Sequence, residues 1–262
     1  MPGPKLLDQV RNVARARHLS LSTERAYAGW IRRFILFHNK KHPKEMAEPE
    51  IRQFISDLAV NAKISASTQT VALSALLFLY RDVLKKPLPY VDHIERAKPS
   101  QKLPVVFTRQ EVQTVLARLD GTHHLIASLL YGSGLRLMEA IRLRVKDIDF
   151  ERSEINVREG KGAKDRVTML PGTLVNNLMS HLRKVRVLHG ADLSAGHGNV
   201  LLPFALSRKY PTTAREWAWQ FVFPSAKLSR DPRSGEIRRH HVHPDHVQRA
   251  VKRAIATQIH KN

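Results

Sequence analysis

Cysteine is absent from the 262-residue sequence, which excludes a disulfide framework, a thiolate metal site and a cysteine nucleophile. Long apolar runs are absent too, since none approaches the roughly 18 residues of a membrane-spanning helix. The first ten residues, MPGPKLLDQV, lack the apolar block of a signal peptide. We therefore expect a soluble protein of the cytoplasm that has no membrane partner.

Acidic residues are scarce, with 23 Asp and Glu against 44 Lys and Arg and a formal net charge of +21. Hydrophobic residues make up 42% of the chain, so it has enough of them to bury a core. Positive charge in such excess attracts polyanions, and nucleic acid is the first candidate partner. A ribosome-associated protein, or a basic surface that serves solubility only, is the alternative. The excess lies in residues 1–100 and 166–262, as expected if two parts of the chain grip one polyanion.

The first 85 residues carry apolar side chains at helical spacing, and these stripes are expected to form a core. Ser22 is the expected N-cap of a helix that carries Tyr27 and Trp30. A polar stretch then contains several prolines, which predicts an extended linker. We place a helical domain at 1–85, a Pro-rich linker at 86–104 and a second domain at 105–262.

The second domain begins with a capping box, Thr108 to Glu111, ahead of a helical stripe. Two short strand-like stretches surround a Gly-containing turn, which predicts a hairpin. The predicted fold class is mainly α with a small antiparallel β-sheet (α+β). We expect strands at 148–150, 154–158 and 166–170, helices at 171–189 and from 244 onward, and an irregular segment at 190–240.

Arg136 follows a Gly-Ser-Gly turn at the start of a short predicted helix, between Leu135 and Leu137. Buried leucines on both sides would fix its guanidinium in one pose, which suits the binding of a phosphate. Glu139 lies on the same helix face and is placed to hold this guanidinium. An ordinary surface pair of Arg136 and Glu139 is the alternative.

Lys161 lies between two glycines in the turn of the predicted hairpin. Glycine allows the backbone to approach a ligand closely, and a lysine there can neutralise a phosphate or protonate a leaving oxygen. A solvated turn lysine is the alternative. The spacing of a nucleotide-binding loop is absent, so the sequence gives no support for ATP dependence.

Aromatic rings and histidines gather in the basic, irregular segment and just after it. The histidines have no cysteine and few acids beside them, so we expect no metal site. Rings in a basic segment can stack on unpaired bases, which is worth roughly 1–3 kcal/mol per base. Trp217 and Trp219 belong to the core in the alternative interpretation. If they alternate on a regular segment, one should face the interior and the other the solvent.

Taken together, these motifs resemble tyrosine recombinases of the phage-integrase type. The resemblance is carried by GLRLME at 134–139 and GKGAKDR at 160–166. The stretches at 22–27 and 65–69 are similar to the core-binding domain of the same proteins, so the resemblance covers essentially the whole chain. Three further stretches resemble an insertion typical of integron integrases: ALSRKYP at 205–211, EWAWQ at 216–220 and VFPS at 222–225.

The resemblance implies a C-shaped DNA clamp, made of a SAM-like core-binding domain and a catalytic domain with an integron-type insertion around 190–240. It implies site-specific recombination that integrates and excises gene cassettes through a 3′-phosphotyrosyl intermediate. The partners would be a duplex attachment site and a cassette site folded from single-stranded DNA into a hairpin, whose flipped-out bases are recognised. Four copies of the chain would assemble on two DNA sites, and no cofactor or metal would be needed.

The resemblance also implies residue roles. Arg136 would bind the non-bridging oxygens of the scissile phosphate, Lys161 would protonate the leaving 5′-oxygen, and Glu139 would orient Arg136. The implied DNA-binding residues lie in the hairpin turn and in the inserted segment with its flank: Lys164, Lys209, Trp219, Pro232, Arg239, His240 and His241.

The nucleophile that the resemblance requires is missing. His246 and Arg249 have the expected His-x-x-Arg spacing but lack the usual neighbours, and no tyrosine follows Tyr210. We therefore expect a C-terminally incomplete chain, truncated before the His-x-x-Arg and Tyr motifs, that binds DNA but does not cleave it alone. A non-catalytic DNA-binding fragment of a decayed or regulatory integrase is the alternative.

Overall fold

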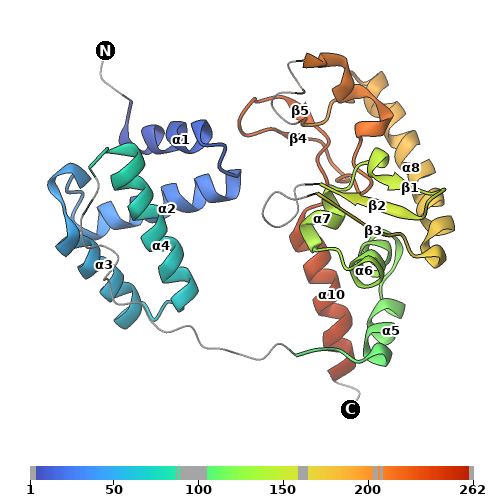
Figure 1. The fold of residues 1–262 in the computed structure, drawn as a ribbon, viewed down its shortest axis with the longest axis horizontal. Coiled ribbons are helices and arrows are strands. Elements are labelled where there is room, and N and C mark those ends of the chain that lie inside the picture. The colour runs from blue at the N-terminus through green and yellow to red at the C-terminus, as the bar shows by residue number, and fades with distance from the viewer. Residues whose placement is uncertain are drawn as a thin grey trace. The chain divides into compact units, whose positions relative to one another are not determined.

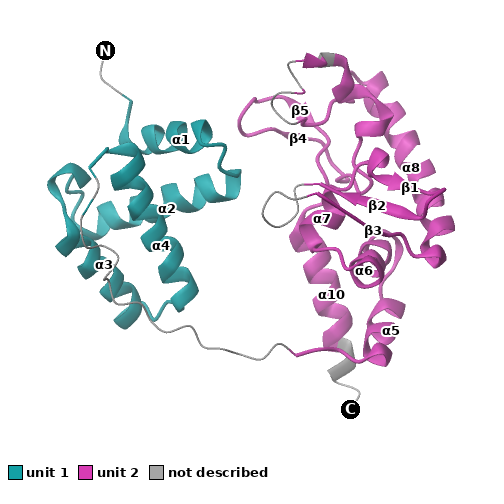
Figure 2. Ribbon diagram, viewed as in Figure 1, with its two compact units in different colours: residues 1–104 teal, residues 105–262 magenta. Residues whose placement is uncertain are grey.

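The computed structural model describes residues 4–86, 88, 105–158, 165–202, 206 and 209–259. The chain divides into two compact units, residues 1–104 and 105–262, which are shown in separate colours in Figure 2. None of the helices in the described part of the chain combines the length and the apolar content that a membrane crossing requires.

The first unit is entirely helical in its described residues (Figure 1). Its core is formed by large apolar side chains from all of the longer helices, among them Phe34 and Phe54, whose rings pack edge to face with centroids 5.5 Å apart. The elements are α1 (Leu6–Ala16), α2 (Leu21–Phe37), a 3-10 turn (Pro43–Glu45), α3 (Glu48–Val60), α4 (Ala66–Phe78) and a π-helical turn (Leu79–Val83).

The N-cap of α2 is Ser20 rather than the expected Ser22, so that prediction was wrong by two residues. The Ser20 Oγ accepts a hydrogen bond from the Thr23 backbone N–H at 3.1 Å and also contacts the Ser22 and Thr23 hydroxyls. Three hydroxyl residues in four positions each fit the N-cap preference, and the sequence does not distinguish them.

The π-helical turn extends α4 and buries two polar residues, Tyr80 and Asp82. The Asp82 side chain is 2% exposed and forms ion pairs with Arg17 at 2.6 Å and with Arg81 at 3.1 Å. A buried carboxylate is tolerated here because these two guanidinium groups, both partly exposed, compensate its charge.

The second unit combines helices with two small antiparallel sheets, so the expected fold class is confirmed. The larger sheet has the order β1-β2-β3, and β2 pairs with β3 as the predicted hairpin. The elements are α5 (Arg109–Ala117), α6 (Gly121–Ser133), α7 (Leu137–Arg142), β1 (Ile148–Asp149), β2 (Glu154–Val157), β3 (Arg166–Met169), α8 (Val175–Ser194), β4 (Ser229–Arg230), β5 (Ile237–Arg238) and α10 (Pro244–Ile259).

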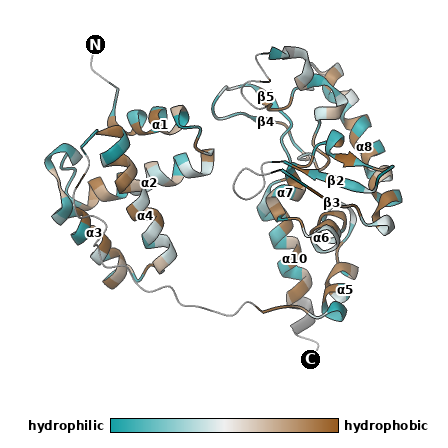
Figure 3. Cartoon of the chain, viewed as in Figure 1, coloured by the Kyte–Doolittle hydropathy of each residue, from teal (hydrophilic) through white to brown (hydrophobic). Residues whose placement is uncertain are grey.

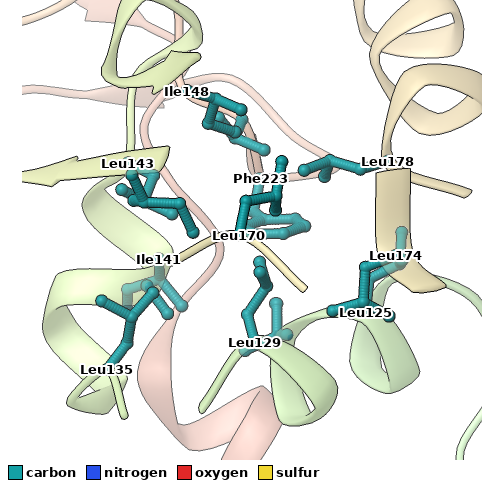
Figure 4. Packing of buried hydrophobic residues seen from close by; sticks show 14 of the residues in the cluster. Leu125, Leu129, Leu135, Ile141, Leu143, Ile148, Leu170, Leu174, Leu178 and Phe223 are labelled. Atoms are coloured by element: carbon teal, nitrogen blue, oxygen red, sulfur yellow. The ribbon is translucent and has the colours of Figure 1, made fainter. Parts of the chain in front are cut away.

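The core of the second unit lies between α6, α7, α8 and the sheet, where Leu129, Ile141, Leu170 and Phe223 pack together (Figure 4). The amphipathic helix α10 carries alternating hydrophobic and hydrophilic patches along its length (Figure 3) and packs against α5 and α6. Thr108 and Glu111 form the predicted capping box of α5. Lys161 and Lys164 lie outside the described residues.

Candidate functional site

Arg136 is placed by a tight turn between two helices. Helix α6 ends at Ser133, and Gly134 follows in the left-handed conformation with φ of 62°. Leu135 is buried, and Arg136 then becomes the N-cap residue of α7. Glycine adopts positive φ without steric cost, so this turn can redirect the chain within two residues. The Arg136 side chain is 58% exposed and therefore available to a ligand.

Glu139 holds Arg136 in this position. The Glu139 carboxylate accepts a hydrogen bond from the Arg136 backbone N–H at 2.8 Å and another from the Arg136 Nη1 at 2.8 Å. The contact between Arg136 and Glu139 that the spacing indicates is thus present. The Glu139 side chain is only 8% exposed, so its negative charge is largely removed from solvent.

Arg166, the first residue of β3, is a second guanidinium on the same carboxylate. Its Nη1 and Nη2 lie 3.0 and 2.8 Å from the Glu139 Oε1 and Oε2. The hydrogen bonds from Arg166, together with those from Arg136, outweigh the effect of burial and lower the pKa of Glu139 to about 2. Glu139 is therefore ionised at neutral pH and braces two arginines at once.

Sequence reasoning assigned no role to Arg166. Its only signal is its place as the last residue of the GKGAKDR stretch, at the point where the predicted second strand begins. The contact with Glu139 joins residues 27 positions apart, and no local periodicity reveals such a contact.

The ends of β2 and β3 that flank residues 159–164, among them Lys161, include Arg166 of this arginine pair. Val157 and Arg166 are the last paired residues of the two strands before the turn. The Thr168 hydroxyl on β3 donates a hydrogen bond to the Ser133 carbonyl at 2.8 Å, which ties the hairpin to the end of α6. The base of the turn and the Arg136 turn are therefore held together by two separate contacts, through Glu139 and through Ser133.

A second group of candidate residues forms an aromatic cluster, made of Trp219, Phe221, His240 and His241. The rings of Phe221 and His240 are stacked, with centroids 5.4 Å apart and an angle of 17° between their planes. His241 meets Phe221 edge to face at 5.3 Å. The Arg144 guanidinium lies 4.3 Å from the Phe221 ring centroid, so it contributes a cation–π contact to the cluster.

The two histidines of the aromatic cluster favour the neutral state. Burial is the main cause that lowers the pKa of His241 to about 4, and the nearby charges of His240, Arg142 and Arg144 act in the same direction. The pKa of His240 is lowered by burial and by the same two arginines. The His241 backbone N–H donates to the His240 Nδ1 at 2.8 Å, which requires that nitrogen to be unprotonated. Both side chains therefore present neutral rings, which suit stacking better than ion pairing.

Trp217 and Trp219 lie in one 3-10 turn and are both half-buried. Trp217 packs against the main core of the unit, whereas Trp219 packs against the small cluster of Val200, Leu202 and Phe221. The expectation of one interior and one exposed ring was wrong, because residues two apart in a 3-10 turn point to different sides and both sides are partly covered here.

The remaining predicted DNA contacts differ in their availability. Pro232 is exposed in the turn between β4 and β5, and Lys209 is exposed with its Nζ 5.3 Å from the Tyr210 ring centroid. Arg239 is 13% exposed, and its Nη2 donates to Asp192 on α8 at 2.7 Å. Its Nη1 donates to the carbonyl oxygens of Ser225 and Ala226, so the Arg239 donors are used within the protein.

Comparison with known protein families defines the class of the molecule. Residues 6–90 match the SAM-like N-terminal domain of phage integrases, and residues 106–258 match the phage integrase family itself. The two units and the braced arginine pair thus belong to an enzyme of the tyrosine recombinase class, whose reaction is site-specific DNA recombination. The chain is a member of the phage integrase family.

Individual relatives agree with this assignment. The chain is 48% identical over 251 residues to an integrase/recombinase of Escherichia coli, which covers 96% of the chain and 74% of that relative. An integrase/recombinase of Pseudomonas aeruginosa shows the same figures. Among solved structures, a lambda integrase tetramer bound to a Holliday junction shares the fold with a TM-score of 0.53 at 12% identity, covering 96% of this chain and 62% of that one.

Proposed function

We propose that this recombinase integrates and excises gene cassettes, and that Arg136 and Lys161 act on the scissile phosphate. The observation that carries the proposal is the buried Glu139 carboxylate, which holds the guanidinium groups of Arg136 and Arg166 in fixed positions. Arg166 offsets the charge of Glu139, so the positive charge of Arg136 remains available to the non-bridging oxygens of a phosphate. Fixed positive charge of this kind stabilises the charge that develops in the transition state.

The proposed division of labour follows the reaction of the family. A tyrosine attacks the phosphate and forms a 3′-phosphotyrosyl bond, while Lys161 protonates the departing 5′-oxygen. Glu139 acts through Arg136 and does not touch the DNA. The energy of the broken bond is retained in the phosphotyrosyl link, so the rejoining step needs neither ATP nor a metal.

The 262-residue chain as it stands is proposed to bind DNA without cleaving it. No tyrosine follows Tyr210, and the His246–Arg249 spacing lies within the continuous helix α10. His246 is exposed on this helix, and the Arg249 Nε donates to the Asp245 carbonyl one turn earlier. A non-catalytic DNA-binding fragment of a decayed or regulatory integrase therefore remains the second candidate function, and it makes the same prediction for this chain.

We further propose that the aromatic cluster recognises the flipped-out bases of a folded, single-stranded cassette site. Neutral histidine rings and a half-buried tryptophan offer flat surfaces in a basic region, which is the chemistry that unpaired bases require. Pro232 and Lys209 are exposed and lie in the same inserted segment and flank as the cluster, so they are proposed as further DNA contacts. Lys164, between β2 and β3 in the sequence, is proposed as another. Arg239 is the least available of the proposed DNA contacts, because most of its donors are used by Asp192 and two carbonyl oxygens.

Assembly as a homotetramer on two DNA sites is also proposed. It is supported by the lambda integrase structure, which is a tetramer bound to a Holliday junction.

A nicked suicide substrate tests the catalytic proposal, because it traps the covalent protein–DNA adduct. The 262-residue chain should bind this DNA and form no adduct. A longer form that carries a later His-x-x-Arg pair and tyrosine should form the adduct, and Arg136→Ala should slow its formation on the order of 10²–10³-fold. The exposed residue Arg183 provides the matched control, since Arg183→Ala should leave the rate unchanged.

Adduct formation by the 262-residue chain would show that another residue supplies the nucleophile. Failure of the longer form to react would favour the non-catalytic alternative.

Hairpin DNA with and without protruding bases tests the recognition proposal. Trp219→Ala should weaken binding of the hairpin with protruding bases by about tenfold, since one stacked base is worth roughly 1–3 kcal/mol. Binding to a duplex of the same sequence should change little. Equal losses on both DNAs would exclude Trp219 as a residue that recognises bases.

A further inference from the structure

Lys146 lies in the 3-10 turn Val145–Asp147, between α7 and β1, and neither part of the proposed function uses it. Its Nζ lies 2.9 Å from the centroid of the Trp219 ring. The ammonium group therefore sits directly over the indole, in the geometry of a strong cation–π contact. The side chain is half-buried, so its position is set by packing as well as by charge.

Arg144 fixes the two turns to each other. Its Nη1 donates to the Trp219 carbonyl at 2.7 Å, and its Nη2 donates to the Leu201 carbonyl at 2.8 Å. The Gln220 carbonyl accepts from the Val145 backbone N–H at 3.0 Å. Lys146 and Trp219 are thus carried by two backbone segments that are bonded together, and their contact does not depend on the side chains alone.

The surroundings of Lys146 are short of negative charge. Among the described groups that affect its pKa, Asp147 is the only acidic one. Both Asp147 oxygens are used, by the Arg158 Nε and by the Arg144 backbone N–H. Burial and the positive charges of Arg158 and Arg144 lower the pKa of Lys146. Within the described residues, the ammonium forms no hydrogen bond or ion pair and contacts only the Trp219 ring. An anion at this place would relieve the repulsion among the three cations.

We propose that Lys146 is a further DNA-binding residue, whose ammonium binds the backbone phosphate of the nucleotide that Trp219 recognises. The proposal rests on the recognition of flipped-out bases by Trp219. A lysine whose head lies over the ring is within reach of the phosphate of a nucleotide that contacts the same ring. Trp219 then supplies the surface for the base on the side of the ring that Lys146 does not cover, Lys146 supplies the charge for the phosphate, and Arg144 is a positioning residue that holds both.

Salt dependence separates this role from simple packing. Each phosphate contact contributes about 0.7–0.9 to the slope of log Kd against log salt concentration, because one counterion is released. Lys146→Met retains an apolar stem over Trp219 but removes the charge. In the full 262-residue chain it should lower this slope on the hairpin with protruding bases by about 0.7–0.9, which is about five- to eightfold weaker binding at about 0.1 M salt. Lys184→Met, at an exposed lysine on α8, is the matched control. It should change the slope for this hairpin by less than Lys146→Met does.

A neutral methylphosphonate next to the protruding base completes the experiment. It should weaken binding of the unmodified chain and have no further effect on Lys146→Met, while Lys146→Arg should restore the slope. If Lys146→Met keeps the original slope, Lys146 only packs against Trp219, although recognition by Trp219 stands. If the unmodified chain binds hairpins with and without protruding bases equally, the proposed recognition fails, and the role of Lys146 fails with it.

Circular dichroism checks that each variant is folded. Lys146→Gln replaces Lys146→Met if the latter is unfolded.

Discussion

Arg166 and Glu139 form a bidentate ion pair that fixes the start of β3 to α7, with N···O distances of 3.0 and 2.8 Å. The same carboxylate holds Arg136, so one buried acid sets the positions of two guanidinium groups that lie on different elements. A planar guanidinium and a planar carboxylate that bond at two points cannot rotate freely relative to each other. The orientation of the proposed phosphate-binding residue therefore depends on a contact with the hairpin.

Glu139→Gln should reduce the free energy of unfolding of the second unit by about 1–3 kcal/mol at pH 7, because two arginines lose their shared counter-charge. Urea unfolding followed by tryptophan fluorescence measures this change. Glu151→Gln, at an exposed position between β1 and β2, is the control and should change the free energy by less than about 0.5 kcal/mol.

The effect of Glu139→Gln should depend on pH in a defined direction. The pKa of Glu139 is about 2 in the folded chain, against its ordinary value of 4.5, which applies to the unfolded chain. Between pH 2 and pH 4.5 the unfolded chain therefore binds more protons than the folded chain. The stabilisation by Glu139 is complete above about pH 4.5 and disappears as the pH falls toward 2. The difference between the unmodified chain and Glu139→Gln should therefore shrink in acid, and a constant difference would contradict the assigned pKa.

Gly134→Ala should destabilise the second unit by about 1 kcal/mol, because alanine is strained at a φ of 62°. Apart from the neighbours in the chain, no atom of the described residues lies within 4 Å of the added Cβ, so the cost comes from the backbone conformation and not from a clash with packed side chains. Gly190→Ala, within α8 and equally unobstructed, should instead stabilise the unit by about 0.5–1 kcal/mol. Thermal unfolding of both variants checks the opposite signs, and a stabilising Gly134→Ala would show that the turn differs from the one described.

His241 should make the stability of the second unit fall between pH 7 and pH 5. Its pKa is about 4 in the folded chain against an ordinary 6.5, so the unfolded chain takes up a proton in this range and the folded chain does not. The loss is about 1–2 kcal/mol between these two pH values. His241→Gln should remove this part of the pH dependence, whereas His246→Gln, at an exposed position on α10, should not. Urea unfolding at both pH values provides the measurement.

Arg239 and Asp192 should show strong energetic coupling in a double-mutant cycle. Both side chains are largely buried, at 13% and 9% exposure, so removal of either partner leaves an uncompensated charge. We expect a coupling energy of about 1–3 kcal/mol from the single and double alanine variants. The exposed pair of Arg11 and Asp8 is the control and should couple by less than about 1 kcal/mol. Equal coupling in the two pairs would show that Arg239 is not held as described.

Local patterns in the sequence were sufficient for several features. The apolar stripes, the capping box at Thr108 and the helix from Pro244 depend on residues within one or two turns of each other, and the structure contains all three. The spacing of three residues between Arg136 and Glu139 also predicts their contact, since such residues lie on one helix face.

Contacts between distant segments were not predictable in the same way. The pairing of Arg239 with Asp192 spans 47 residues, and that of Arg166 with Glu139 spans 27. A basic residue in a DNA-binding protein has the same local signal whether it faces DNA or an internal acid, so the sequence indicates Arg239 as a DNA contact and does not reveal its pairing with Asp192. The choice between Ser20 and Ser22 as N-cap failed for a different reason, because adjacent hydroxyl residues have nearly equal preferences.

The π-helical turn at Leu79–Val83 makes the first unit sensitive to chain length at one point. A π turn accommodates one residue more than an α-helical turn, and this residue rotates everything after it by about 100° around the helix axis. Deletion of a single residue before Asp82 would leave a regular helix but would move the Asp82 carboxylate away from Arg17, while Arg81, its neighbour in the sequence, would move with it. A point deletion, which most helices of this unit would accommodate at their ends, would here separate one buried negative charge from its counter-ion at the end of α1.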